Sequence, residues 1–115
     1  MNELIIYHNG ECSKSNGALE MLQAEHIPHH VRWYLAEPLS KEELASLLQK
    51  LELNAFDIVR KSEPLYKEQF EGREYSNDEW IAILAENPIL IERPIVEKDG
   101  KAVVARPAEK LHTIL

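Results

Sequence analysis

The sequence predicts an α/β fold, a small mixed sheet that carries helices on its faces. Three observations lead to this prediction. A strand, a helix and a second strand follow one another at the start of the chain. A β-hairpin and a short helix end it. Between these parts, the apolar residues recur at helical spacing. The expected order of elements is therefore β-α-β, a helical insertion, then β-β-α.

The first part of the chain is predicted to be a βαβ unit. An apolar run at residues 4–7 indicates a buried strand over 4–8, the pattern from about 13 to 26 indicates a helix, and the alternation at 30–34 indicates a second strand. Strands joined in this way lie parallel, with a right-handed crossover. Gly17 weakens the helix by about 1 kcal/mol relative to alanine.

Residues 36–87 are predicted to form a mainly helical insertion within one domain that spans residues 1–115. Two capping boxes mark helix starts, Ser40 with Glu43 and Ser76 with Glu79. Asn54 can begin a short helix between them. Residues 62–75 are expected to be irregular and solvated.

The end of the chain is predicted to return to β structure. The Asp-Gly pair at residues 99–100 separates two apolar runs, at 95–97 and 102–105, which is a strong hairpin signal. Pro107 then begins a last helix. Pro94 stands directly before a strand, where a cis peptide bond is an alternative to trans.

Composition excludes several classes of protein. The formal net charge of −7 argues against general nucleic-acid binding, and no apolar run is long enough to span a membrane. A single cysteine cannot form an internal disulfide, which fits a reducing compartment. The first residues lack the basic start of a signal peptide. We therefore expect a cytoplasmic protein.

The only cysteine, Cys12, lies between the first strand and the first helix. Helix N-terminal N–H groups stabilise a thiolate, so we expect a thiol pKa below the ordinary value of about 8.5. Lys14 favours the thiolate and Glu11 opposes it. A small buried apolar residue is the alternative interpretation of this cysteine.

Three arginines, Arg60, Arg93 and Arg106, each stand at the end of a predicted element. Brought together, they would bind a tetrahedral oxyanion through forked hydrogen bonds, whereas each alone is a surface residue or an ion-pair partner. His8 either tunes the thiolate or is a structural histidine. The remaining histidines form no metal motif with cysteine, and we expect neither a metal nor a bound cofactor.

Several segments carry a resemblance to a known family. They are Tyr7-His8-Asn9 with Cys12 and Ser15, Leu19-Glu20-Met21-Leu22, Tyr34-Leu35, Arg60-Lys61, Asn87-Pro88-Ile89-Leu90-Ile91, Arg93-Pro94-Ile95-Val96 and Arg106-Pro107. Together they resemble the glutaredoxin-linked arsenate reductase family, which has a thioredoxin-like fold. The resemblance implies that Cys12 is the nucleophile in arsenate reduction, a detoxification of arsenic. Arg60, Arg93 and Arg106 would hold the arsenate, and His8 and Ser15 would support the thiolate. Glutathione would be the co-substrate, and glutaredoxin would regenerate the thiol.

Two alternatives belong to the same superfamily: a regulatory binding protein of the Spx type, which acts on RNA polymerase, and an uncharacterised thiol oxidoreductase. Many Spx-type regulators carry a second cysteine in the motif, where this chain has Ser15. A thiol–disulfide switch is therefore absent, which favours the enzyme. A phosphatase-like arsenate reductase would need an arginine at position 18, which is alanine.

Overall fold

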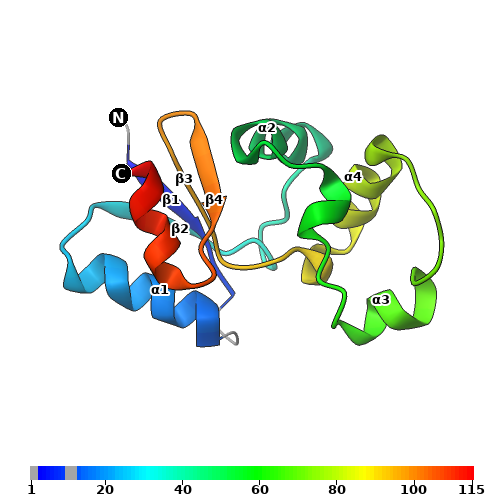
Figure 1. Ribbon diagram of the computed structural model, residues 1–115, viewed down its shortest axis with the longest axis horizontal. Helices are drawn as coiled ribbons and strands as arrows, with labels where there is room; N and C mark the ends of the chain where they lie inside the picture. Colours follow the sequence, from blue (N-terminus) through cyan, green and yellow to red (C-terminus); the bar gives the residue numbers. More distant parts are fainter. Residues whose placement is uncertain (1–2, 10–12) are drawn as a thin grey trace. The chain divides into compact units, whose positions relative to one another are not determined.

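A computed structural model of the chain describes residues 3–9 and 13–115 (Figure 1). These residues form two compact units. The first unit takes in residues 1–37 and 93–115, and the second takes in residues 38–92. Whether the chain behaves as one domain stays a prediction.

The first unit is built on a four-stranded sheet. Its strands are β1 (Leu4–Tyr7), β2 (His29–Arg32), β3 (Ile95–Lys98) and β4 (Lys101–Val104), in the spatial order β2-β1-β3-β4. β1 pairs with β2 in parallel, and the other two pairs are antiparallel. Helix α1 (Ser13–Ala24) connects β1 to β2. The mixed sheet and the βαβ unit predicted from the sequence are confirmed.

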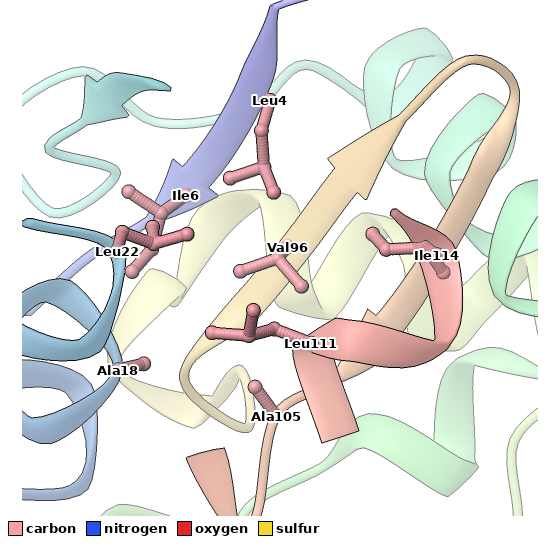
Figure 2. Close-up of a cluster of buried hydrophobic side chains, with 8 residues drawn as sticks. All are labelled: Leu4, Ile6, Ala18, Leu22, Val96, Ala105, Leu111 and Ile114. Atoms are coloured by element: carbon pink, nitrogen blue, oxygen red, sulfur yellow. The ribbon is translucent and has the colours of Figure 1, made fainter. Parts of the chain in front are cut away.

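One face of this sheet is covered by α1 and by the C-terminal 3-10 helix η3 (Ala108–Ile114). Leu4 and Ile6 alternate along β1 and so point to the same face, where Val96 lies opposite Ile6. Figure 2 shows the helix side chains pointing toward these strand residues. The complete buried cluster is Leu4, Ile6, Ala18, Leu22, Val96, Ala105, Leu111 and Ile114.

The second unit is mainly helical. Its elements are α2 (Lys41–Leu51), η1 (Ala55–Ile58), α3 (Pro64–Gln69), α4 (Asn77–Glu86) and η2 (Pro88–Leu90). Both predicted capping boxes are present. Ser40 Oγ accepts from the Glu43 N–H at 3.1 Å while the Ser40 N–H donates to Glu43 Oε1 at 2.9 Å, and Ser76 and Glu79 repeat the arrangement before α4. Val59 and Ile91 form an isolated antiparallel bridge.

One expectation about the elements was wrong. Residues 62–75, expected to be irregular, contain α3, in which Tyr66 is buried and its ring lies 6.4 Å from that of Trp80. Six residues are too few to show a helical period, so this tertiary contact stabilises a helix that the pattern does not reveal. The predicted last helix is present, as a 3-10 helix with Pro107 at its N-cap.

The turns at the end of the chain follow the sequence. Asp99 and Gly100 have φ of 52° and 80°, as a type I′ hairpin turn requires. The peptide bonds Arg93–Pro94 and Arg106–Pro107 are both cis.

Candidate functional site

The strand register gathers four of the predicted site residues at one end of the sheet. Tyr7 pairs with Ile95, and Ile95 pairs with Val104. The C-terminal end of β1, the beginning of β3 and the C-terminal end of β4 therefore lie at the same end of the sheet. The residues just beyond these pairs include His8, Arg93 and Arg106. Ser15 joins them from the first turn of α1 through its hydrogen bond to His8.

His8 and Ser15 form a buried pair. His8 Nδ1 lies 2.6 Å from Ser15 Oγ, and the backbone N–H of Asn9 donates to the same oxygen at 3.1 Å. His8 is only 2% exposed, and Ser15 is fully buried. The hydroxyl accepts from Asn9 and has one proton of its own to donate. Whether that proton goes to Nδ1 or elsewhere depends on the tautomer of His8.

Burial lowers the pKa of His8 below its ordinary value of 6.5, because the charged imidazolium loses its hydration. His8 is therefore neutral at neutral pH. A neutral imidazole bonded to a hydroxyl can exchange a proton with it but brings no charge of its own to an anion.

Arg93 and Arg106 lie together at this end of the sheet. Arg106 Nη1 donates to the backbone carbonyl of Arg93 at 2.9 Å, and the Ala105 N–H donates to the Pro94 carbonyl at 2.9 Å. Arg93 is only 7% exposed, while Arg106 is partly exposed. A buried guanidinium of this kind offers several N–H donors in a fixed plane, which suits an oxyanion.

Arg60 belongs to the second unit. Its backbone N–H donates to the Leu90 carbonyl at 2.6 Å, next to the bridge between Val59 and Ile91. Its side-chain Nε lies 3.5 Å from Glu63 Oε2, beyond good hydrogen-bond distance. Within the described part of the chain, the buried Nε and Nη1 atoms of Arg60 have no hydrogen-bond partner. The inclusion of Arg60 in one anion site with Arg93 and Arg106 stays a prediction.

The predicted nucleophile, Cys12, lies outside the described residues. Across residues 3–9 and 13–115, no group of three or more His, Cys, Asp or Glu side chains gathers as a metal site. Among these residues, no helix has the length and apolar character needed to cross a membrane.

Sequence reasoning missed Trp33 as a member of this site. Its indole meets the imidazole of His8 edge to face, with ring centroids 4.8 Å apart and planes at 71°. The signal lies in the register, because Tyr7 pairs with Arg32 in parallel and the next residues on each strand are His8 and Trp33. From the sequence alone, Trp33 is simply a core or partly buried aromatic residue.

A βαβ unit continued by an antiparallel hairpin, with helices on the sheet, defines an α/β protein with the thioredoxin-like fold. The predicted nucleophile, Cys12, stands in the sequence between β1 and α1, and His8 and Ser15 lie on either side of it in the chain. Comparison with known proteins supports this class and narrows it.

Residues 7–114 match the ArsC family. The chain is 39% identical over 117 residues to the arsenate reductase of Neisseria meningitidis serogroup A, with all of both chains covered. It is 38% identical over 112 residues to the uncharacterized protein YfgD of Escherichia coli K12, covering 96% of this chain and 94% of that one. The solved structure of the arsenate reductase from Vibrio cholerae superimposes with a TM-score of 0.93 at 43% identity, covering 99% of this chain and 98% of that one. The chain belongs to the ArsC family.

Proposed function

We propose that this protein reduces arsenate to arsenite with Cys12 as the nucleophile, glutathione as co-substrate and glutaredoxin as the reductant that restores the thiol. The observation that carries the proposal is the similarity, over the full length of the chain, to proteins named arsenate reductase. The grouping of His8, Ser15, Arg93 and Arg106 at the end of the sheet where α1 begins adds physical support. A reducing, cytoplasmic setting fits a reaction that needs free thiols.

The proposed reaction balances in atoms and electrons. The Cys12 thiolate attacks arsenic(V) and forms a sulfur–arsenic bond, and one arsenate oxygen leaves as water. Glutathione then supplies the second thiol. When arsenite departs, the two electrons of the sulfur–arsenic bond stay on arsenic, which becomes arsenic(III). The two sulfurs are left joined as a mixed disulfide. In sum, arsenate and two thiols give arsenite, one disulfide and water. Glutaredoxin then takes the glutathione from Cys12 by thiol–disulfide exchange.

The arginines would bind the oxyanion and stabilise the charge that develops on it. Arsenate carries negative charge on several oxygens, and guanidinium groups donate to such oxygens in pairs. The protein as a whole has a formal net charge of −7, so its overall field repels arsenate. Local positive charge from Arg93 and Arg106, joined by Arg60, would have to overcome this repulsion.

His8 and Ser15 would support the thiolate. Ser15 Oγ accepts from the Asn9 N–H, which leaves its single proton for one acceptor. When His8 carries its proton on Nδ1, the Ser15 proton is available to a thiolate. A hydrogen bond to the charged form of a thiol lowers its pKa. The pair would thus act on the sulfur without adding net charge.

An arsenate reduction assay with glutathione and glutaredoxin tests the proposal. We expect arsenite to form in proportion to wild-type protein, and no formation above the uncatalysed rate with Cys12→Ser. The matched control is Ser62→Ala, an exposed serine in the second unit, which should behave as wild type. Arsenite formation by Cys12→Ser at the wild-type rate, or none by the wild type, would contradict the proposed function. The second result would favour the regulatory alternative.

A further inference from the structure

His8 lies between a hydroxyl and an indole. Ser15 Oγ lies 2.6 Å from its Nδ1, and the Trp33 ring centroid lies 4.8 Å from its own. His8 is 2% exposed, whereas Trp33 is 49% exposed. The indole therefore lies against the buried imidazole, while about half of Trp33 faces the solvent.

The backbone holds Trp33 in this position. The Trp33 carbonyl accepts from the N–H groups of Ala36 and Glu37 at 3.0 and 2.8 Å, which closes a turn directly after β2. Arg32 Nε donates to the Glu37 carbonyl at 3.0 Å and braces the same turn. On the other strand, the His8 N–H donates to the Arg32 carbonyl at 2.9 Å. Both rings thus stand on backbone fixed by hydrogen bonds.

Core packing accounts for only part of this tryptophan, which is 49% exposed. The buried cluster of the first unit and the apolar residues packed against it do not include Trp33. A large aromatic side chain that stays half exposed contributes only part of its possible burial. Its one ring contact among the described residues is the imidazole of His8.

We propose that Trp33 is a positioning residue of the candidate site, whose indole covers the His8 imidazole and holds its Nδ1 against Ser15 Oγ. The proposal rests on the proposed function in giving the His8–Ser15 pair the task of supporting Cys12. The cover excludes water that would otherwise compete with Ser15 for the ring nitrogens. An edge-to-face aromatic pair also fixes the ring plane, and such pairs are worth a factor of about two to ten in an equilibrium.

Loss of the indole should let water reach His8. Because burial is what lowers the pKa of His8, hydration should return that pKa toward 6.5. The indole also attracts a charged imidazolium, so loss of this attraction would by itself lower the pKa of His8. Burial should dominate, since the ring is almost completely enclosed.

The first experiment measures how accessible His8 is to diethyl pyrocarbonate, which acylates neutral, exposed imidazoles. Peptide mass spectrometry gives the rate at each histidine, with exposed His30 as internal standard. In the wild type, His8 should react more slowly than His30. Trp33→Ala should speed the reaction at His8 about two- to tenfold, and Trp33→Phe should restore much of the protection. The matched control is Leu35→Ala, an exposed apolar residue two positions on, which should leave His8 protected.

The second experiment measures the pKa and tautomer of His8 by NMR, and the pH profile of iodoacetamide alkylation at Cys12, both without arsenate. Trp33→Ala should raise the pKa of His8 and shift the pH at which alkylation of Cys12 is half-maximal. Trp33→Phe should return both quantities toward their wild-type values. An unchanged His8 pKa and an unchanged midpoint in Trp33→Ala would overturn the proposal. Equal reactivity of His8 and His30 in the wild type would also overturn it, even if Trp33→Ala failed to fold.

These measurements separate the two proposals. Changes at His8 and Cys12 in a protein that reduces no arsenate would contradict the proposed function and support the assignment of Trp33. Arsenate reduction with no response of His8 to the Trp33 variants would support the proposed function and contradict the assignment of Trp33.

Discussion

At the scale of single residues, the site depends on groups that lose water on folding. The Ser15 hydroxyl and the His8 imidazole are both buried, and each satisfies the other. Arg93 is almost fully enclosed, and Arg106 donates to its carbonyl. Removal of one member of such a pair leaves the other buried without its hydrogen bond, which costs about 1–3 kcal/mol of folding stability.

The buried His8 should make stability depend on pH. Its pKa is lower in the folded chain than the ordinary 6.5, so the unfolded chain binds the proton more readily. The contribution of neutral His8 is fully present above pH 6.5 and is lost as the pH falls from there toward the lower pKa of the folded state. The loss is at most about 1.4 kcal/mol per pH unit.

Urea denaturation at pH 5–8 measures this dependence. His8→Asn should flatten the curve in this window, because its amide can occupy the place of Nδ1 but cannot be protonated. His30→Asn, at an exposed position of β2, serves as the control and should keep the wild-type slope. An identical slope in wild type and His8→Asn would show that His8 is not the group responsible.

The three arginines should contribute alike to catalysis but differently to the free energy of unfolding. Each change to alanine should lower kcat/KM for arsenate about tenfold or more, because a charge-assisted hydrogen bond is worth about 1.5–3 kcal/mol. Lysine should rescue only in part, since it lacks the planar fork. Arg60→Ala should change the free energy of unfolding little, since its buried Nε and Nη1 atoms have no hydrogen-bond partner within the described chain. Arg106→Ala should destabilise by about 1 kcal/mol through loss of the bond to Arg93.

Steady-state kinetics checks the predicted loss of kcat/KM, and urea denaturation of the same variants checks the predicted free energies of unfolding. Arg73→Ala removes an equal charge from an exposed position and should match wild type in both measurements. Wild-type kinetics in all three alanine variants would leave the arginines outside the site.

At the scale of elements, most starts and turns are fixed by their own residues. The capping boxes before α2 and α4 each connect a serine to a glutamate three residues on, and the β3–β4 hairpin turns at Asp99-Gly100. Helix α1 depends less on its own residues, because Gly17 in an interior turn lowers its helix propensity. Its position depends on the packing of Ala18 and Leu22 against the sheet (Figure 2).

Replacement by alanine should have opposite effects on the free energy of unfolding at Gly17 and at Gly100. A Cβ added at Gly17 meets no atom within 4 Å, so Gly17→Ala should raise the free energy of unfolding by about 0.5–1 kcal/mol. Gly100 also has open space but a φ of +80°, so Gly100→Ala should destabilise the hairpin by about 1 kcal/mol or more. Thermal or urea unfolding of the two variants in parallel decides the matter. A destabilised Gly17→Ala would mean that α1 does not keep its described conformation.

At the scale of the whole molecule, the chain has one cysteine, and no second sulfur can resolve a disulfide on Cys12. Neither Ser13 nor Ser15 can replace it, because a hydroxyl is too weak a nucleophile toward a disulfide. The proposed reduction therefore needs a thiol from outside the protein.

We predict that turnover depends on an external small thiol, with glutathione as the first candidate. Intact-mass spectrometry of protein quenched at low pH during turnover should find one glutathione joined to the chain, and Cys12→Ser should carry none. Thioredoxin as the sole thiol source should give no sustained turnover. Multiple turnovers under that condition would contradict the mechanism, even with arsenate as the substrate.

The sequence by itself determined the features that depend on neighbours along the chain. The βαβ start, both capping boxes and the Asp-Gly hairpin are local patterns, and they fix the order of elements and the α/β class. The single cysteine leads to the prediction that the proposed reduction needs an external thiol. Only the tertiary structure decided the contacts among the site residues. Ser15 reaches His8, Arg106 reaches Arg93, and Trp33 covers His8 through strand register and burial. It also decided that α3 forms, because a helix of six residues is stabilised by its packing and not by its own sequence.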